Sequence, residues 1–488
     1  MRPDLIVRRD LLAGRVLNRI GPGGLIHAPG TSRVLESALL LALLTNEDLL
    51  PEQAELTRRY LKNTLAHDPP DPLQHCFAQA ALGDTVAADQ AVEAALSPFR
   101  HFSSERKMLT FRTLLHEVAG STAARHRLPP DTYEVGDQQV WLSMQMCALK
   151  AMTAPEEATD ADWTRLAPAL RPGPAWQANH LARLIALFAL RKHPAHRPAV
   201  RGTLVRIAAE QLPGGGVPFV TGLDVFATAV AGLALARVRP RDPRLTAMAD
   251  ALAAHQNPDG GLGFTTGVTQ SDIDDTSYTL EFLRAVTPGR HGEAITRAER
   301  YLLDQQNTDG GFPSFVRGTP SEIAMTAGAV NALAPSHRRA AERGVAFLVA
   351  AGPVEERSWS RNATNAAFRT TLACGTLTGD APASLRSAAR NTQRRCRARL
   401  AETQETDGGW GHEPGGPSDP ISTAYAVIAL SGAPGHTAVL GRALAYLLDR
   451  QQDDGGFSSR PDQAGPRPLL HDIPALADVN VLLGLSFV

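Results

Sequence analysis

Gln306-Asn-Thr-Asp-Gly-Gly-Phe312 is one of four copies of a turn signature in the second half of the chain. The other copies begin at Gln256, Gln404 and Gln451, and each carries the same Asp-Gly-Gly core. Successive copies are separated by one or two intervals of about 50 residues. Self-similarity at a fixed period is the mark of a repeat architecture, so this signature decides the fold.

The long interval predicts a degenerate copy near residues 344–359, and a weaker copy precedes the series at Gln211. Apolar runs at helical spacing flank the turns, so each repeat is predicted to be a helical hairpin. Gly-Gly supplies the positive φ angle of a tight reversal, and Gln and Asp can cap helix ends. Such hairpins cannot bury their faces alone, so about six of them are predicted to close into an all-α ring, an α/α barrel.

Three carboxylates crowd together in Asp272-Ile-Asp274-Asp275-Thr276 at the predicted start of an inner helix. Like charges this close cannot all ionise cheaply, so at least one pKa is expected to rise and its proton to be held at neutral pH. Helix capping is the alternative, because Ser and Asp suit a helix N-terminus. A cap needs only one such residue, so the cluster predicts a buried Brønsted acid.

The repeat register places further acidic residues at the same mouth of the barrel, at or near the starts of other inner helices. These residues are Asp224, Glu322, Asp419 and Asp472.

Composition narrows the class of protein. The chain has 488 residues, 43% of them hydrophobic, and a formal net charge of -1. Its length suggests two or three domains, and its charge argues against a nucleic-acid-binding face. Four cysteines without a CxxC pair are expected to be reduced thiols, which favours a cytoplasmic protein. The longest apolar run, residues 38–44, is too short to span a bilayer, and no signal peptide is recognised.

The DxDDT sequence on an inner helix, within Q-x-x-D-G-G-aromatic repeats, resembles the class II terpene cyclases, specifically the bacterial two-domain sesquiterpene and diterpene type. Segments 410–425 and 465–478 resemble the same group, and the likeness covers most of residues 210–488. It implies two helical domains with a cavity between or within them. Residues 31–200 would be the γ domain and residues 201–488 the β domain, which residues 1–30 would return to complete.

The resemblance implies cyclisation of a linear prenyl diphosphate that is started by a proton. Asp274 would protonate the terminal alkene, with Asp272 and Asp275 orienting it, and Glu322 is a candidate partner or else a plain helix cap. A carbocation cascade would follow with the diphosphate retained, and a base would remove a proton to leave a bicyclic alkene. His412, His471 and a bound water are all open as that base.

Carbocations need an apolar wall with electron-rich faces, and a diphosphate needs cations. The wall candidates are Trp359, Tyr278, Phe368 and Tyr425, while Trp410 in a repeat turn is expected to serve packing. The candidate phosphate clamps are Arg357, Arg361 and Arg467, with surface salt bridges as the alternative. Magnesium is the cofactor that the family implies. Its candidate ligands are Glu156, Glu157 and Asp160, with a solvated loop after Pro155 as the alternative.

Other functions compete with this hypothesis. A protein prenyltransferase β subunit shares the toroid, but its zinc site needs Asp, Cys and His, and Cys374 and Cys396 lack such neighbours. Triterpene cyclases share DxDDT but are usually longer, and the DDxxD motif of class I cyclases is missing. A non-catalytic toroid that binds partners leaves the carboxylate cluster unexplained. Farnesyl and geranylgeranyl diphosphate present the same reacting alkene, so both remain candidate substrates, for drimenyl-type or for copalyl- and halimadienyl-type products. The oligomeric state is also left open.

Overall fold

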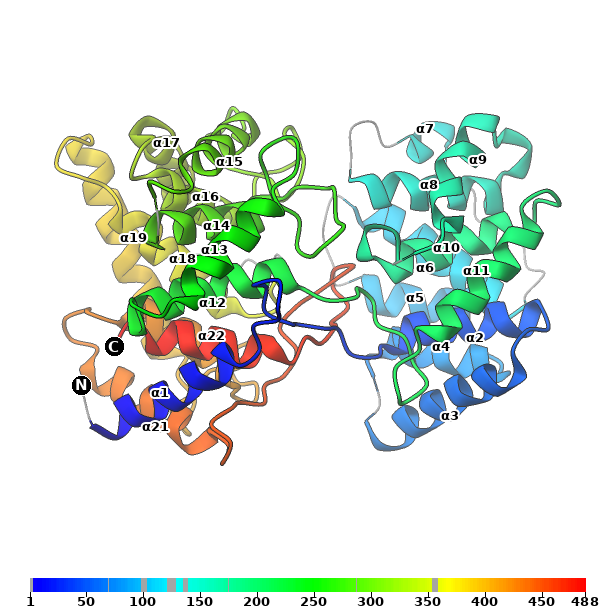
Figure 1. Ribbon diagram of the computed structural model, residues 1–488, viewed down its shortest axis with the longest axis horizontal. Helices are drawn as coiled ribbons and strands as arrows, with labels where there is room; N and C mark the ends of the chain where they lie inside the picture. The colour runs from blue at the N-terminus through cyan, green and yellow to red at the C-terminus, as the bar shows by residue number, and fades with distance from the viewer. Residues whose placement is uncertain are drawn as a thin grey trace. The chain divides into compact units, whose positions relative to one another are not determined.

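The computed structural model describes residues 3–68, 70–97, 103–120, 129–134, 139–173, 175–286, 288–352 and 359–488. These residues form helices joined by turns and isolated β-bridges (Figure 1), so the predicted all-α class is confirmed. The chain divides into two compact units: unit 1 comprises Met1–Pro29 and Gly222–Val488, and unit 2 comprises Gly30–Thr221. None of the described helices combines the length and the apolar composition that a bilayer crossing needs.

Unit 1 is a closed double ring of helices. In its described part, each inner helix packs on the next and the last packs on the first. The inner helices are α12 (Asp224–Val238), α14 (Ile273–Val286), α16 (Ile323–Leu333), α18 (Ala363–Gly375), α20 (Pro420–Leu430) and α22 (Ala475–Leu485). The outer helices are α13 (Arg244–Ala254), α15 (Gly292–Gln305), α17 (Arg338–Ala351), α19 (Ala383–Glu402), α21 (Thr437–Arg450) and α1 (Pro3–Leu17). The predicted α/α barrel is therefore confirmed.

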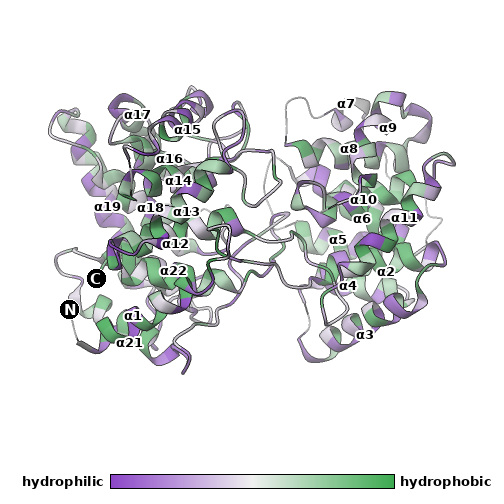
Figure 2. Cartoon of the chain, in the orientation of Figure 1, coloured by the Kyte–Doolittle hydropathy of each residue, from purple (hydrophilic) through white to green (hydrophobic). Residues whose placement is uncertain are grey.

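Hydropathy separates the two rings, because a helix that is apolar on every side must be buried whereas an amphipathic helix can face water. Every residue of the inner helix α20 is buried. The outer helix α19 carries many charged residues and buries only a narrow stripe (Figure 2).

The repeated turn holds neighbouring hairpins together. The Gln306 side-chain amide donates to the carbonyl of Gly310 within its own turn, at 2.8 Å, and to the carbonyl of Ala340 on the next outer helix, at 2.9 Å. Gly310 has a φ of +87°, and a Cβ there would meet the Arg343 carbonyl at 2.7 Å, which explains why glycine is needed. Gln256 and Gln404 make the same pair of hydrogen bonds.

The N-terminal helix α1 takes the outer position that follows α21. Gln451, in the last turn of the series, donates to the carbonyl of Arg8 at 3.0 Å, as its counterparts do to their own next outer helices. Arg15 of α1 and Arg19, which follows it, both contact Asp478 of α22, at 2.9 and 3.1 Å. Residues from the two ends of the chain thus close one ring.

Unit 2 is a second helical body. Its helices are α2 (Val34–Asn46), α3 (Pro51–His67), α4 (Pro72–Leu82), α5 (Ala88–Leu96), α6 (Ser104–Val118), α7 (Pro130–Tyr133), α8 (Val140–Thr153), α9 (Asp160–Leu166), α10 (His180–Leu190) and α11 (Arg197–Ala209), with short 3₁₀ segments at Pro155–Glu157, Ala167–Leu170 and Trp176–Ala178. The apolar helices α2 and α10 form its core.

The division between the units differs from the expected one between residues 200 and 201, which falls inside α11. The weak repeat copy explains the difference. Gln211 donates to the carbonyl of Gly215 at 3.0 Å and to that of Gln53 on α3 at 3.2 Å, so this turn is part of unit 2. The degenerate copy expected at residues 344–359 begins within α17, and its residues 353–358 lie outside the described residues.

Candidate active site

Acidic residues stand at the starts of the inner helices, as the repeat register predicted. Asp224 is the first residue of α12, Asp272 directly precedes α14, Glu322 and Asp419 are the N-caps of α16 and α20, and Asp472 lies shortly before α22. The barrel therefore has one mouth at which the N-termini of the inner helices and their carboxylates gather.

Two of the three clustered aspartates are buried against each other. Asp272 is 6% exposed and Asp275 is 3% exposed, and the Asp275 backbone N–H donates to Asp272 Oδ1 at 2.8 Å. Burial, with repulsion from Asp274, raises the pKa of Asp272 to about 7. Burial and repulsion from Asp272 raise the pKa of Asp275 well above its usual value. The expected rise in pKa is thus found, and this carboxyl pair holds a proton at neutral pH.

Asp274 faces away from this pair and meets an arginine from another inner helix. Its side chain is 20% exposed, and Arg369 of α18 donates from Nη1 to Oδ1 at 2.5 Å and from Nη2 to Oδ2 at 3.3 Å. Arg369 also lies over the ring of Tyr278, one turn further along α14, at 4.7 Å from its centroid. Asp274 is therefore held by a charge-assisted pair while one edge stays accessible.

Glu322 connects to the aspartate cluster through Ser314. It accepts hydrogen bonds from Arg467 at 2.9 Å and from the Ser314 hydroxyl at 2.6 Å. The Ser314 carbonyl accepts the backbone N–H of Ile273 at 3.0 Å, and its hydroxyl accepts Trp359 Nε1–H at 2.8 Å. Through Ser314, Glu322 is thus linked to Trp359 and to the backbone at the start of α14, and Arg467 is bonded to Glu322 itself. The link from Glu322 toward Asp274 passes through the backbone of Ile273.

The four aromatic candidates lie around these charged pairs. Phe368 stacks on Tyr425 with centroids 4.8 Å apart. Tyr278 meets Phe226 edge to face at 5.7 Å. Trp359 lies beneath the guanidinium of Arg467, at 4.8 Å. Trp410 is buried and donates from its indole to a backbone carbonyl of α19, which fits the packing role expected for it.

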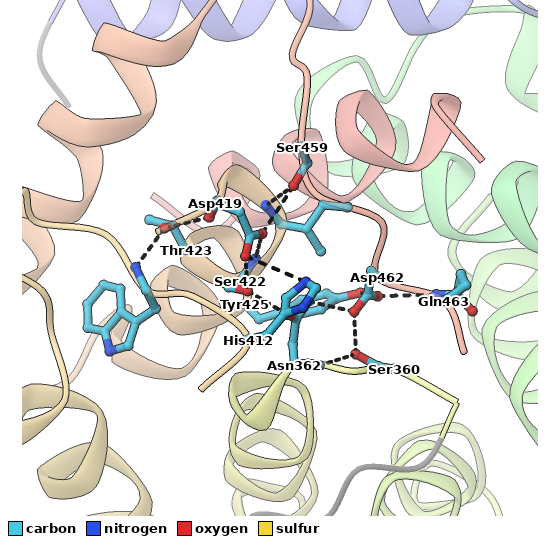
Figure 3. A network of polar contacts seen from close by, with 12 residues as sticks. Ser360, Asn362, His412, Asp419, Ser422, Thr423, Tyr425, Ser459, Asp462 and Gln463 are labelled. Atoms are coloured by element: carbon cyan, nitrogen blue, oxygen red, sulfur yellow. Dashed lines mark hydrogen bonds and ion pairs between the residues drawn. The ribbon is translucent and has the colours of Figure 1, made fainter. Parts of the chain in front are cut away.

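A second acidic centre, which the sequence analysis missed, surrounds Asp462 (Figure 3). Asp462 is 3% exposed and accepts hydrogen bonds from Ser360 and Asn362 at 2.5 Å each and from the Tyr425 hydroxyl at 3.1 Å. Burial raises its pKa to about 6. Asn362 continues the network, because its side-chain oxygen accepts the hydroxyl of Ser422 at 2.6 Å.

The network extends to Asp419 and to one of the candidate bases. Ser422 donates its backbone N–H to Asp419 Oδ1 at 2.8 Å, and its hydroxyl oxygen also lies 2.6 Å from Asp419 Oδ2. His412 Nε2 lies 3.8 Å from Asp419 Oδ2 (Figure 3). His471 is half-buried in the loop before α22, and its backbone N–H donates to the Gln463 carbonyl.

The remaining candidates are those for the diphosphate and for the metal. Arg361 donates its backbone N–H to the Asp462 carbonyl at 2.8 Å, whereas Arg357 lies outside the described residues. Glu156 and Asp160 of unit 2 are exposed and Glu157 is partly exposed. Within the described ranges no group of three or more His, Cys, Asp or Glu side chains could hold a metal, so these three carboxylates do not form a ligand cluster by themselves.

Comparison with known proteins adds to this geometry. No family model matches the chain. The chain is 56% identical over 500 residues to a drimenyl diphosphate synthase of Streptantibioticus cattleyicolor, covering 98% of this chain and 94% of that protein. It is 51% identical over 510 residues to a drimenyl diphosphate synthase of Streptomyces showdoensis, covering 98% and 93%. The structure of ent-copalyl diphosphate synthase from Streptomyces platensis has the same fold, with a TM-score of 0.64, 20% identity and coverage of 100% of this chain and 99% of that one.

Proposed function

The chain belongs to the drimenyl diphosphate synthase family of class II terpene cyclases, and from this premise we propose that it converts farnesyl diphosphate into drimenyl diphosphate. Enzymes of this class are isomerases that cyclise a linear prenyl diphosphate without breaking its bond to the diphosphate. The farnesyl substrate rests on the names of two relatives that share more than half of their residues with this chain.

Asp274 is the proposed acid, and its position is the observation that carries the mechanism. It is the member of the cluster with an accessible edge, so its proton can reach the terminal alkene of a substrate. When the O–H bond of Asp274 breaks, a C–H bond forms and the positive charge passes to carbon. The π electrons of the next two alkenes then close two rings, and loss of a proton leaves a bicyclic alkene.

Arg369 helps this transfer by stabilising its product on the enzyme. Protonation of an alkene demands a strong acid, and an acid is strengthened when its conjugate base is stabilised. The carboxylate left on Asp274 is paired with the Arg369 guanidinium and lies at the N-terminus of α14, where negative charge is favoured. Asp272 and Asp275 share a proton beside Asp274, so together they carry less than two full negative charges. The repulsion that they exert on the Asp274 carboxylate is reduced accordingly.

The aromatic side chains at the mouth are proposed to line the path of the cation. Tyr278, Phe368, Tyr425 and Trp359 present ring faces, and ring faces attract positive charge without adding to it as a nucleophile would. His412, His471 and a bound water remain candidates for the final base. The position of His412 Nε2, 3.8 Å from Asp419 Oδ2, supports His412 among these candidates.

The diphosphate requires positive partners. Arg361 and Arg467 are proposed to contact it, and Arg357 stays a candidate from the sequence. Magnesium keeps several waters and binds through one or two carboxylates together with substrate phosphates. Glu156, Glu157 and Asp160 could at most supply such loose contacts, because they form no cluster of their own, and the chemistry proposed for Asp274 does not depend on them.

The direct test is to incubate the purified chain with farnesyl or geranylgeranyl diphosphate and magnesium, treat the products with phosphatase and identify the alcohols by mass spectrometry. A bicyclic fifteen-carbon alcohol is expected from farnesyl diphosphate, at a higher kcat/KM than any product of the longer substrate. If only geranylgeranyl diphosphate gave a bicyclic product, the proposal that farnesyl diphosphate is the substrate would be wrong. Release of inorganic diphosphate during the first step would overturn the class of reaction.

A further inference from the structure

The inner face of α14 carries a second acid that the proposed function does not use. Glu281 follows Asp274 by two turns and Tyr278 by one, and residues at this spacing share one face of a helix. Glu281 is partly exposed and has no place in the mouth of the barrel. A carboxyl group on the inner ring, beyond the acid, requires an explanation because charged side chains are seldom buried without a partner.

Glu281 lines a cavity of about 50 Å³ that is bordered by inner helices and by Phe487. Its polar lining residues are Arg237, Ser277, Tyr278, Glu281, Asn331 and Arg369, and its apolar ones include Leu233, Phe368 and Phe487. Arg369 is the member that reaches both the cavity and Asp274, because its two terminal nitrogens bond the carboxylate at 2.5 and 3.3 Å. The cavity therefore lies directly behind the ion pair of the proposed acid.

The cavity wall contains buried polar atoms that call for a hydrogen-bond partner. Ser277 Oγ and Arg369 Nε are buried and make no hydrogen bond with the described residues. These residues are 1% and 4% exposed. A polar cavity needs roughly 10–15 Å³ to hold a water molecule and offers it two to four partners. This one has room for several waters, and they would bridge Arg369, Ser277 and Glu281.

The charges around Glu281 allow it to both hold and release a proton. Arg237 of α12, Arg369 of α18 and Arg284 on its own helix favour its carboxylate, and Asp274 opposes it. Burial is the largest effect, and the pKa of Glu281 rises to about 7. Both protonation states are therefore populated near neutral pH.

A cyclase whose acid is Asp274 must recover a proton in every turnover. The proton given to the alkene leaves with the product, while the proton lost by the final cation goes to a different base. Asp274 is then a carboxylate paired with Arg369, and substrate or product covers its edge at the mouth. A route from behind is needed if reloading is to occur before the next substrate binds.

Resting on the proposed function, we propose that Glu281 reprotonates Asp274 after each turnover through water in the cavity behind Arg369. The O–H bond of Glu281 breaks, the water relays the proton, and an O–H bond forms on Asp274. The carboxylate of Glu281, which is partly exposed, then takes a proton from solvent. No net charge or redox change accompanies the cycle.

The test separates the first turnover from later ones, using Glu281→Gln and rapid quenching with farnesyl diphosphate. With enzyme in excess, the single-turnover rate should stay within about twofold of the wild type, because the proposed relay acts only after the first proton has passed to the alkene. With substrate in excess, kcat should fall at least about tenfold, with an initial burst of one product per active site. The slow phase should show a solvent deuterium isotope effect.

Two further variants control the experiment. Glu281→Asp keeps the carboxyl group and should restore most of kcat. Glu293→Gln removes the charge of an exposed residue in the first turn of α15 and should leave both phases unchanged. A Glu281→Gln enzyme with wild-type kcat, or one whose single-turnover rate falls as much as its kcat, would overturn the relay. Failure of the wild type to form any bicyclic product would instead overturn the proposed function.

Discussion

Two acidic centres lie in the same barrel, and they differ in what surrounds their carboxylates. Asp462 is enclosed by neutral donors, from Ser360, Asn362 and Tyr425, and is 3% exposed. Asp274 is bonded by one guanidinium and keeps a side-chain exposure of 20%. Neutral donors on every side fix a carboxylate in place, whereas a single cation and an open edge leave it able to exchange a proton. From this contrast we propose that Asp462 is structural and Asp274 reactive.

The sharpest way to break this comparison is to exchange the two aspartates for asparagine in turn. Asp274→Asn removes the acidic proton but keeps the shape, so kcat should fall at least about 10³-fold, since general acid catalysis alone contributes up to about 10⁴-fold. The midpoint of thermal unfolding should stay near that of the wild type. An Asp274→Asn enzyme with substantial activity, measured by product formation, would remove Asp274 from the role of acid.

Asp462→Asn should act chiefly on stability. Ser360 and Asn362 donate to one carboxylate oxygen, and Tyr425 and Gln463 donate to the other. An amide nitrogen cannot accept hydrogen bonds, so replacing either oxygen takes the acceptor from two donors. We expect a loss of about 2–4 kcal/mol in the free energy of unfolding, measured by urea denaturation. If the variant unfolds like the wild type but has lost its activity, Asp462 is part of the reaction and the contrast between the centres fails.

Arg369→Gln tests the cation that distinguishes the reactive centre. Without the guanidinium, the carboxylate that Asp274 leaves behind loses its charge-assisted pair, and we expect kcat to fall about 10²-fold with a smaller change in KM. Arg369→Lys keeps the charge but not the bidentate geometry, so it should recover only part of kcat. Equal activity of the wild type and Arg369→Gln would show that the ion pair contributes nothing to the transfer.

The sequence predicts the features of these centres that depend on residues close together in the chain, and it does not predict contacts between distant segments. The Gln-x-x-Asp-Gly-Gly spacing fixes the repeat length, and with it the closed barrel and the acidic starts of the inner helices. The contact between Arg369 and Asp274 joins α14 to α18, and no periodicity specifies which inner side chains meet across a ring. A signal was still present, because an arginine in the otherwise uncharged segment 363–375 must find a partner once it is buried.

Asp462 was missed for a different reason. It lies in the loop before α22 rather than at a helix start, so the repeat register does not point to it. The division into compact units differs from the expected boundary at residue 200 for a related reason, since the turn after Gln211 belongs by its hydrogen bonds to the unit before it. Loops and long-range contacts are decided by tertiary packing, which a motif does not encode.

The dependence of stability on pH sharpens the contrast between Asp272 and an ordinary exposed aspartate. The pKa of Asp272 is about 7 in the folded chain, above the value near 3.9 expected when unfolded. Between these two pH values Asp272 binds more protons in the folded state than in the unfolded state. The stability of the folded state should therefore fall as pH rises from about 4 to about 7, and Asp272 should cause no further change above that range. Asp272→Asn should flatten the slope by up to about 1 kcal/mol per pH unit in urea titrations. A wild-type slope that is less negative than that of Asp272→Asn over this range would contradict the buried pair.

The smallest effect on activity is expected from replacing carboxylates that are exposed or partly exposed and do not cluster with other acidic residues. Glu156 is exposed and Glu157 partly exposed in unit 2, and within the described ranges they join no cluster able to hold a metal. If magnesium is held mainly by the diphosphate, Glu156→Gln and Glu157→Gln should each raise the magnesium concentration needed for half-maximal activity by no more than about threefold. EDTA should lower the activity of the wild type and of both variants to the same extent. A loss of tenfold or more in magnesium affinity in either variant would mean that this segment holds the metal when substrate is bound. The reactive machinery would then extend beyond the barrel mouth, because a second set of carboxylates would act on the same substrate at its diphosphate end.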